Sequence, residues 1–322
     1  MEIAAKSPVR PADAAAIRDA AALLRAGKLV AFPTETVYGM GADATNDYAV
    51  ADIFAAKQRP RLNPLIVHVA SCEHAEEYSA FNATAQKLAA TFWPGALTLV
   101  LTRRGDCTLS RLVSAGLDTV ALRVPAHPVA QELLAESGLP IAAPSANASG
   151  RISATTAEHV CRSLDGKIEL ILDAGPTALG LESTVIGFDA GMPLLLRTGA
   201  ISRGDIENVV GRLKDAASVS IRSPGQLASH YAPRASVRLN ADSVRQDEAL
   251  LAFGPEIPLG AKVTVNLSEK RDVREAAVNL FAHLHTLDAT GLPIAVMPIP
   301  RDGLGEAIND RLARAAAARD KS

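Results

Sequence analysis

Apolar residues along the chain follow two periodicities, which predict helices and strands in alternation. Between Asp13 and Gly27 they recur at helical spacing, and both end residues suit a helix terminus. Short apolar runs of strand length occupy residues 29–32, 65–69 and 97–101. Strands that alternate with helices, together with hairpin-like strand pairs, favour an α/β fold with a mixed, twisted sheet.

The same criteria predict further elements as far as residue 210, and regular patterning then fails from residue 214 to 235. Beyond that gap strands again alternate with helices, which indicates a second, small α/β domain. The further helices are predicted at residues 46–57, 82–92, 128–137, 156–164, 202–210, 273–287 and 304–318. The further strands are predicted at residues 37–40, 118–124, 140–143, 168–172, 184–188, 194–196, 249–253, 263–265 and 294–297.

The composition is that of an ordinary globular protein with enough residues for two domains. The chain has 322 residues, of which 48% are hydrophobic and 21% are charged. It contains no apolar run as long as a membrane span. The N-terminal segment carries charges and prolines where a signal peptide would need an apolar core. We therefore expect a cytoplasmic enzyme with no membrane contact.

The cysteines, the net charge and the absent motifs restrict the chemistry. Cys72, Cys107 and Cys161 are too far apart for a zinc site and too few for a disulfide framework. The sequence has no P-loop, dinucleotide fingerprint, zinc-protease or nucleophile-elbow motif. The net charge of −2 gives no general attraction to nucleic acid. If a nucleotide binds, local cations, hydroxyls and backbone N–H groups must hold its phosphates.

Four groups of polar residues lie at the ends of predicted strands, where an open α/β sheet presents its ligand residues. Cations and hydroxyls occur together in them without a matching acidic excess, which suits a phosphorylated or carboxylated ligand. The groups are Thr34, Glu35, Thr36 and Tyr38; Lys57, Arg59, Arg61 and Asn63, with His68 one strand later; Ser145, Ala146, Asn147, Ser149, Gly150 and Ser153; and Glu182, Ser183 and Thr184, with Arg197 at the end of the next strand.

Taken singly, each group also has a plainer interpretation. The cations from Lys57 to Arg61 could form a solvated helix C-terminus favoured by the helix dipole. His68 in an apolar strand could be a hydrogen-bonded core residue. Residues 145–150 could be a loop of turn-forming residues. Only the joint occurrence of the four groups favours a ligand site.

Arg123 raises a separate question, because it lies inside an apolar predicted strand. A buried guanidinium without a partner would be strongly destabilising, so an anion must lie beside it. Glu35 or Glu182 could supply a structural carboxylate, and a substrate carboxylate is the alternative. The position of Arg123 alone favours the structural carboxylate.

Six motifs then match, in order, the pattern of a known family. The chain resembles the Sua5 branch of the YrdC/Sua5 family, the threonylcarbamoyl-AMP synthases. The motifs are PTETVYGMG at residues 33–41, K-x-R at 57–59 within KQRPRLNPL, S-x-N at 145–147 within APSANASG, ESTVI at 182–186, LLRTGAI at 195–201 and SPGQLASHYAP at 223–233. The departure is Gln226, where methionine is expected.

The resemblance implies a domain organisation. Residues 1–211 would form a YrdC-like catalytic domain, an α/β fold with a twisted mixed sheet, helices and a concave, positively charged face. Residues 212–234 would be a linker carrying SPGQLASHYAP, and residues 235–322 a C-terminal Sua5 domain, small and Rossmann-like. Because the expected product is labile in water, we interpret the linker as a lid over the site. A passive linker is the alternative.

The resemblance also implies a reaction, in which L-threonine, bicarbonate and ATP give threonylcarbamoyl-AMP, diphosphate and water. The product would feed formation of N6-threonylcarbamoyladenosine in tRNA, where downstream threonylcarbamoyl transferase proteins complete the modification. A non-catalytic module that binds double-stranded RNA or tRNA is the runner-up hypothesis. A carbamoyl-phosphate-dependent transferase is disfavoured, because the acylphosphatase-like and zinc-finger segments of such proteins are missing.

The resemblance finally assigns roles to individual residues. Lys57 and Arg59 would be catalytic, with Lys57 near the bicarbonate-derived carboxylate and the α-phosphate. Mg²⁺ would be carried by ATP and not by a protein metal site. The threonine pocket would comprise Thr36, His68, Arg123, Ser183 and the backbone of Ala143. The ATP side would comprise Arg59, Asn63, Thr119, Ser145, Asn147, Ser153, Arg197 and Tyr231.

Overall fold

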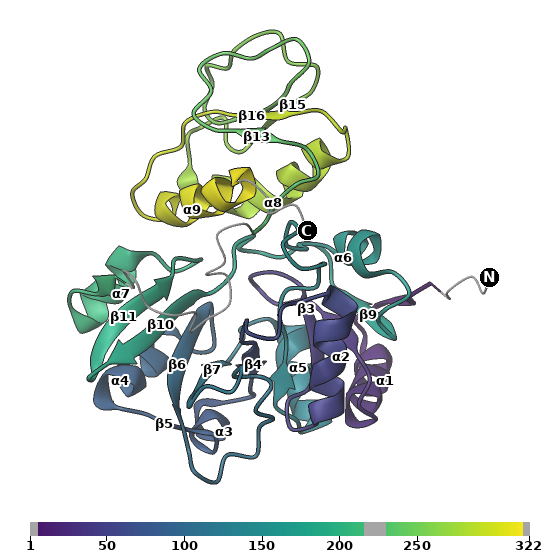
Figure 1. Cartoon of the computed structure of the whole chain (residues 1–322), viewed down its shortest axis with the longest axis vertical. Coiled ribbons are helices and arrows are strands. Elements are labelled where there is room, and N and C mark those ends of the chain that lie inside the picture. Colours follow the sequence, from purple (N-terminus) through teal and green to yellow (C-terminus); the bar gives the residue numbers. More distant parts are fainter. Residues whose placement is uncertain (1–5, 216–229, 318–322) are drawn as a thin grey trace.

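The computed structural model describes residues 6–215 (the large domain) and residues 230–317 (the small domain), each built on one β-sheet (Figure 1). The mixed, twisted α/β architecture predicted from the sequence is confirmed. The motif at residues 223–233 lies outside the described residues except for its last four positions. Within the described ranges, none of the helices has the length and hydrophobicity needed to cross a bilayer.

The sheet of the large domain has twelve strands and mixes parallel with antiparallel pairs. The strands are β1 Val9–Pro11, β2 Val30–Phe32, β3 Gly39–Asp43, β4 Ile66–His68, β5 Ser79–Ala80, β6 Leu97–Arg103, β7 Thr119–Arg123, β8 Ile141–Ala142, β9 Leu170–Asp173, β10 Thr184–Asp189, β11 Met192–Arg197 and β12 Lys214–Asp215. Their order is β1-β9-β2-β3-β8-β4-β7-β6-β10-β11-β12, and β5 pairs with β6. Strands β4 and β7 run parallel between antiparallel neighbours, so His68 and Arg123 lie side by side.

Several helices of the large domain begin at polar residues that cap their first turn. The helices of this domain are α1 Ala14–Arg25, α2 Asp47–Lys57, α3 Cys72–Glu76, α4 Ala83–Phe92, α5 Pro128–Ser137, α6 Ala157–Leu164 and α7 Arg203–Val210. The side chains of Asn46, Asn82, Thr156 and Ser202 each accept a hydrogen bond from a first-turn N–H group. Helix α2 ends when Gln58 adopts a left-handed conformation, with φ of 52°. That turn sets the direction of the chain between Lys57, the last residue of the helix, and Arg59.

The small domain is a parallel sheet covered by two helices. Its strands are β13 Val237–Arg238, β14 Ala249–Ala252, β15 Thr264–Asn266 and β16 Ile294–Val296, in the order β13-β16-β14-β15, and its helices are α8 Val273–Asp288 and α9 Gly305–Ala316. Figure 1 shows α8 and α9 on the side of this sheet that faces the large domain. The helices therefore mediate the contact between the domains.

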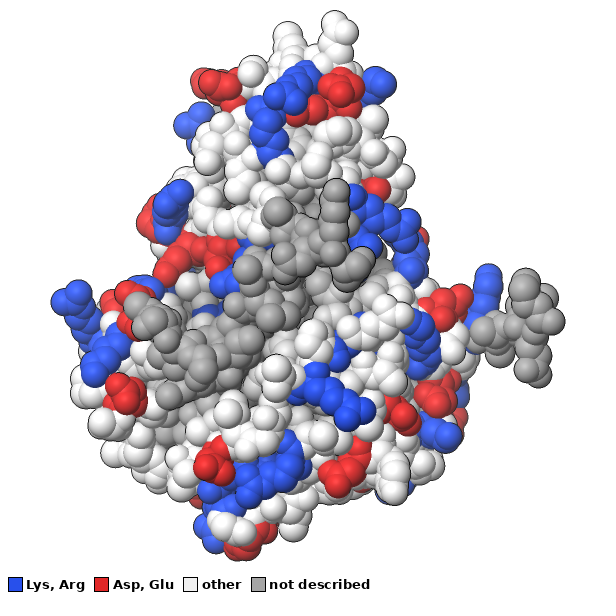
Figure 2. Space-filling view, in the orientation of Figure 1, with Lys and Arg blue, Asp and Glu red and all other residues white. Residues whose placement is uncertain are grey.

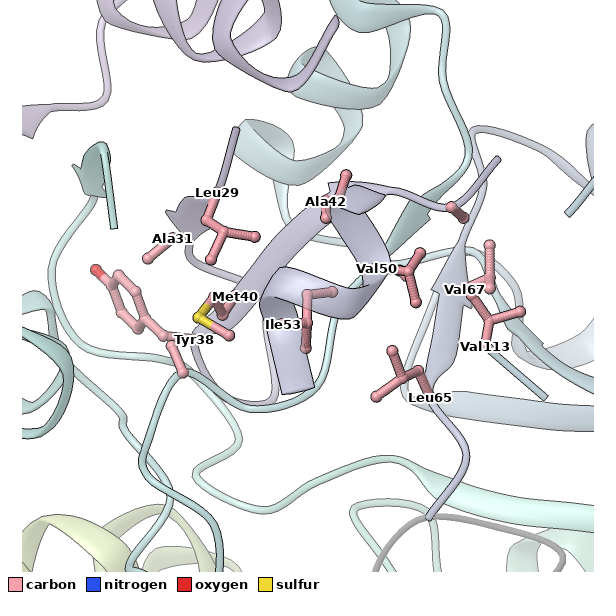
Figure 3. Packing of buried hydrophobic residues seen from close by; sticks show 14 of the residues in the cluster. Leu29, Ala31, Tyr38, Met40, Ala42, Val50, Ile53, Leu65, Val67 and Val113 are labelled. Carbon is pink, nitrogen blue, oxygen red and sulfur yellow. The ribbon is translucent and has the colours of Figure 1, made fainter. Parts of the chain in front are cut away.

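A hydrophobic cluster beneath α2 positions the strands that end at the site. Met40, Ile53, Leu65 and Val67 from β3, α2 and the β4 region pack together there (Figure 3). Each such aliphatic side chain contributes about 1.5–3 kcal/mol when fully buried. This packing holds the C-terminal end of α2 next to β4.

A second cluster joins the two domains. Val37, Ile152 and Leu181 of the large domain pack with Phe281 of α8 and Ile308 of α9. All five side chains are buried. Val37 lies within the PTETVYGMG motif and Leu181 directly precedes ESTVI. Their spacing in the sequence did not indicate that the small domain would bury them.

Several short elements that depend on distant partners were not predicted from the sequence. Strands β1, β5, β12 and β13 and helix α3 were not predicted, and each has five residues or fewer. Pro11, expected at the start of the first helix, instead ends β1, which pairs with β9. The strand expected at residues 37–40 begins only at Gly39, because residues before it form a turn. Such segments gain their hydrogen bonds from residues far away in sequence.

Candidate active site

A cavity lies where several strands of the large sheet end, next to the first residues of the small domain. Cations and hydroxyls from distant segments converge there, as the sequence predicts, although their roles stay predictions. The predicted site residues that line it are Thr36, Arg59, His68, Arg123, Ala143, Ser145, Ser183, Arg197 and Tyr231. Thr34, Val37, Gly39, Ile66, Pro144, Glu182 and His230 complete the wall.

Arg123 has a structural carboxylate as its partner. Its Nη2 donates to Glu35 Oε1 at 2.6 Å, its Nη1 to Thr36 Oγ1 at 2.9 Å and its Nε to the Gly95 carbonyl at 3.1 Å. Burial alone would raise the pKa of Glu35, but the charge of Arg123, together with hydrogen bonds from Arg123 and from backbone N–H groups, lowers that pKa. The pair with Glu35 confirms the structural carboxylate that the position of Arg123 favoured, so the buried guanidinium needs no substrate carboxylate for its neutralisation. Arg123 still lines the cavity.

His68 is a neutral side chain in the same wall. It ends β4 beside Arg123 and is only 3% exposed. Burial, reinforced by Arg123, lowers its pKa to about 3. Its Nδ1 has no hydrogen-bond partner among the described residues. A buried imidazole with an unsatisfied nitrogen beside a cavity suits contact with a ligand better than a purely structural role.

Lys57 is buried behind the cavity and does not line it. Its Nζ donates to the backbone carbonyls of Ser145 and Asn147, and the side chain is 1% exposed. The interpretation as a solvated helix terminus is therefore wrong for Lys57. Burial, and next the charge of Arg59, lower its pKa well below the ordinary value. Lys57 fixes the S-x-N loop from behind.

Arg59 reaches the cavity wall from the turn after α2. Its Nε donates to the Asn63 carbonyl at 3.1 Å and its Nη2 to the Pro64 carbonyl at 2.8 Å. Burial lowers the pKa of Arg59 to about 10, so it remains a cation at neutral pH. Asn63 lies behind the wall, and both polar atoms of its buried side chain lack a partner within the described chain. Arg61 is exposed and outside the wall.

Of the loop after β8, Ser145 lines the cavity while Asn147 and Ser153 support it. The Asn147 amide donates to the carbonyls of Ala148 and Arg151 at 2.9 and 3.0 Å. The Ser153 hydroxyl donates to Glu182 Oε1 at 2.7 Å. The structure therefore does not bring Asn147 or Ser153 into the cavity wall. Ser145 and Ser149 are half-buried, whereas Asn147 is buried and its Oδ1 has no partner among the described residues. A plain loop would not require Ser145 to line the cavity, so the ligand-site interpretation of this segment stays a prediction.

Strands β10 and β11 bring a hydroxyl and a cation together. The Oγ atoms of Ser183 and Thr98 lie 2.7 Å apart. Arg197 donates from Nη2 to the Ser183 carbonyl at 2.8 Å and to Ser183 Oγ at 3.2 Å. Both residues are more than nine-tenths buried. Arg197 is therefore held rigidly at the cavity.

Tyr231 and His230 enter the wall from the start of the small domain. Tyr231 is 1% exposed, and its hydroxyl has no partner among the described residues. Its ring packs on Phe281, with centroids 5.5 Å apart. Burial lowers the pKa of His230 to about 3. Since residues 223–229 lie outside the described chain, the lid hypothesis stays a prediction.

Thr119 is a predicted site residue that does not line the cavity. It begins β7, four residues before Arg123 on the same strand, which corresponds to roughly 13 Å at the usual rise per residue. Thr34, Glu182 and His230 line the cavity although no ligand role was assigned to them. Each stood inside a motif already singled out, so the motifs carried the signal and only the assignment was missing.

The charges of the site are local. On the face in Figure 2, acidic and basic side chains of the described residues are interspersed. Arg59, Arg123 and Arg197 are each at most 8% exposed. In the described part of the chain, no group of three or more His, Cys, Asp or Glu residues could hold a metal ion.

Comparison with known proteins agrees with this architecture. A family model described as "Telomere recombination" (Sua5, YciO and YrdC) matches residues 22–199, and one described as "Threonylcarbamoyl-AMP synthase, C-terminal domain" matches residues 201–317. Two relatives named threonylcarbamoyl-AMP synthase come from Pyrococcus abyssi, at 44% identity over 93% of both chains, and from Bacillus subtilis, at 42% identity over 94% of this chain and 93% of the relative.

A solved structure resembles the chain over nearly its whole length. The crystal structure of P. abyssi Sua5 complexed with L-threonine superposes with a TM-score of 0.86 at 41% identity, and the match covers 93% of this chain and 94% of that chain. Both domains are therefore shared with that protein. The chain belongs to the Sua5/YciO/YrdC family, in the Sua5 branch of threonylcarbamoyl-AMP synthases.

Proposed function

We propose that this chain forms threonylcarbamoyl-AMP from L-threonine, bicarbonate and ATP in the cavity described above. The observation that carries the proposal is the convergence of Arg59, Arg123 and Arg197 with the hydroxyls of Thr36 and Ser183 in one cavity. The carboxylate of threonine needs a cation, and its hydroxyl needs hydrogen-bonding groups. A triphosphate needs several cations. Membership of the Sua5 branch and the threonine complex of P. abyssi Sua5 support the same assignment.

Threonine would bind on the wall formed by β3, β4, β7 and β10. Arg123 is paired with Glu35 but still lines the cavity, where it can orient a carboxylate. Thr36 and Ser183 offer hydroxyls, and neutral His68 offers a nitrogen without adding charge. The backbone of Ala143 lines the same wall.

ATP would bind on the side of Arg59, Ser145, Arg197 and Tyr231. The two arginines stabilise negative charge on the polyphosphate, and the unsatisfied Tyr231 hydroxyl can donate to the nucleotide. We expect Mg²⁺ to arrive with the triphosphate, where it neutralises charge during the transfer. Asn63, Asn147 and Ser153 lie behind this wall, so we propose supporting roles for them; Thr119 remains a more distant candidate.

The chemistry would consist mainly of positioning and charge stabilisation. The threonine amine loses a proton and attacks CO₂ or activated bicarbonate, which gives an N-carboxylate. That carboxylate attacks the α-phosphorus of ATP, and diphosphate leaves. Arg59 lies where it can stabilise the developing charge, whereas Lys57 acts from behind by fixing the loop that presents Ser145. A cover over the site would protect the labile product.

The test is a stoichiometric assay with purified protein. Diphosphate release from ATP should require both L-threonine and bicarbonate, and mass spectrometry should detect threonylcarbamoyl-AMP. Release without that double dependence would remove the proposal. We expect the product to pass to threonylcarbamoyl transferase proteins that modify tRNA, and hence a cytoplasmic location; a direct tRNA contact is a further expectation.

The non-catalytic RNA-binding module is not favoured. Relatives that match the chain over both domains are named as synthases, and the cations of the site are buried rather than displayed on a broad surface. A gel shift that is insensitive to ATP and steeply dependent on salt would reverse this preference.

A further inference from the structure

Arg311 of α9 is a buried cation at the contact between the domains. Its side chain is 0% exposed, although it belongs to the small domain. Its Nε donates to Glu182 Oε2 at 3.0 Å, its Nη2 to the Thr198 carbonyl at 2.7 Å and its Nη1 to Asp310 Oδ2 at 2.7 Å. Every guanidinium nitrogen therefore has an oxygen partner, and two of the three partners belong to the large domain.

Two neighbours of Arg311 line the cavity, although Arg311 itself does not. One is Glu182, whose other oxygen accepts a hydrogen bond from Ser153 at 2.7 Å. The other is Tyr231, whose ring centroid lies 5.1 Å from the Arg311 guanidinium carbon, within the range of a cation–π contact. Arg311 therefore touches the carboxylate and the aromatic ring of the wall at once.

The carboxylate needs this cation for an electrostatic reason. Burial alone would raise the pKa of Glu182, but Arg311, then Arg197, and the hydrogen bond from Ser153 act together to lower that pKa. Glu182 is thus an anion in the wall of a cavity where a polyphosphate would bind. Without Arg311, its charge would repel the nucleotide and compete for Arg197.

We propose that Arg311 is a positioning residue of the small domain, which neutralises Glu182 and fixes Tyr231 so that the cavity accepts a nucleotide triphosphate. The inference rests on the proposed function and deepens it. It assigns the small domain a part in forming the nucleotide wall, beyond the hydrophobic contact between the domains. The nucleotide side should depend on Arg311, whereas the threonine side, held by Arg123 and its partners in the large domain, should not.

The test measures ATP and L-threonine binding separately, by calorimetry on the full chain. Arg311→Met should weaken ATP binding about tenfold or more, a coupling within the usual range between sites, and should change threonine binding by less than about threefold. Arg238→Met is the matched control. Arg238 also pairs with a buried carboxylate, Glu248, at 2.5 Å, but both lie within the small domain and outside the cavity. It should leave both affinities unchanged.

A second substitution separates positioning from general destabilisation. Glu182→Gln in the Arg311→Met background should recover part of the ATP affinity, because the uncompensated charge is gone. If Arg311→Met does not fold, Arg311→Lys keeps the charge but loses the forked geometry, and should still weaken ATP binding about threefold or more. ATP affinity equal to wild type in the variant that folds, or equal losses of ATP and threonine affinity, would overturn the inference.

The wild-type protein distinguishes this failure from a failure of the proposed function. If wild type releases diphosphate with threonine and bicarbonate but the Arg311 variants bind ATP normally, only the positioning role is wrong. If wild type shows no such reaction, the proposed function is wrong, whatever the variants do.

Discussion

The cavity has two walls that differ in how their charges are satisfied. In the wall formed by β3, β4 and β7 (the sheet wall), Arg123 finds Glu35 and Thr36 within the large domain. In the wall at the domain contact (the junction wall), Glu182 depends on Arg311 of the small domain. Both ion pairs are buried, so the loss of either residue of a pair would leave the other as an uncompensated buried charge.

The difference teaches which part of the site each domain supplies. The sheet wall is complete once the large sheet has formed, since strand pairing places His68 beside Arg123. The junction wall forms only when the small domain docks, because Tyr231 and Arg311 come from the small domain whereas Glu182 comes from the large one. We therefore expect L-threonine binding to depend on the stability of the large domain. ATP binding should depend on docking of the small domain.

The largest expected effect is on the sheet wall. Arg123→Met leaves Glu35 buried without its cation, so we expect unfolding to become easier by about 3–5 kcal/mol. Turnover should fall at least about a hundredfold. Chemical denaturation and diphosphate release measure the two effects. Adding Glu35→Gln should restore most of the stability but not the turnover; recovery of both would show that Arg123 has only a structural role.

Lys57→Ala tests the loop that presents Ser145 to the junction side. Without Nζ, two buried carbonyls lose their donor and the loop can shift, and a displacement of about 1 Å can lower turnover about a hundredfold. Circular dichroism should show an intact fold. Lys167→Ala is the matched control, because Lys167 donates to the Ala56 carbonyl of the same helix but is exposed. A loss under tenfold for Lys57→Ala would contradict the positioning role.

The sequence predicted the sheet wall better than the junction wall for a physical reason. The motifs around Thr36 and His68 lie at strand ends, and strand ends converge in an open sheet. Arg311 carried no such signal, because a cation in an amphipathic helix usually faces solvent. Its burial depends on docking against residues more than a hundred positions away. Lys57 shows the reverse error, since its motif was found but its side chain points behind the loop.

A pH experiment compares the neutral histidines of the two walls. The pKa of His68 and of His230 falls to about 3 in the folded protein, from an ordinary value of about 6.5. Because the unfolded chain then binds more protons between these values, stability is fully present above about pH 6.5 and is lost as pH falls toward 3. Each histidine should contribute up to about 1.4 kcal/mol per pH unit in that window.

Replacement by glutamine provides the check. His68→Gln and His230→Gln should each flatten the decline of the unfolding free energy between pH 6 and about 4, measured by urea denaturation. Imidazole signals that titrate above about pH 5 in the folded protein would contradict the buried, neutral state of either wall. Flattening by only one of the two variants would show that the other histidine does not have a lowered pKa in the folded protein.

The smallest effect is expected from Tyr231→Phe, which removes only the hydroxyl that lacks a partner among the described residues. Stability should not fall, because no hydrogen bond is lost, and removing a buried unsatisfied hydroxyl can even stabilise. ATP affinity should fall about three- to tenfold, as for the loss of one hydrogen bond. Calorimetry with ATP and with threonine measures this. Since the ring and its contacts with Phe281 and Arg311 remain, unchanged ATP affinity would show that the junction wall acts through packing and charge alone.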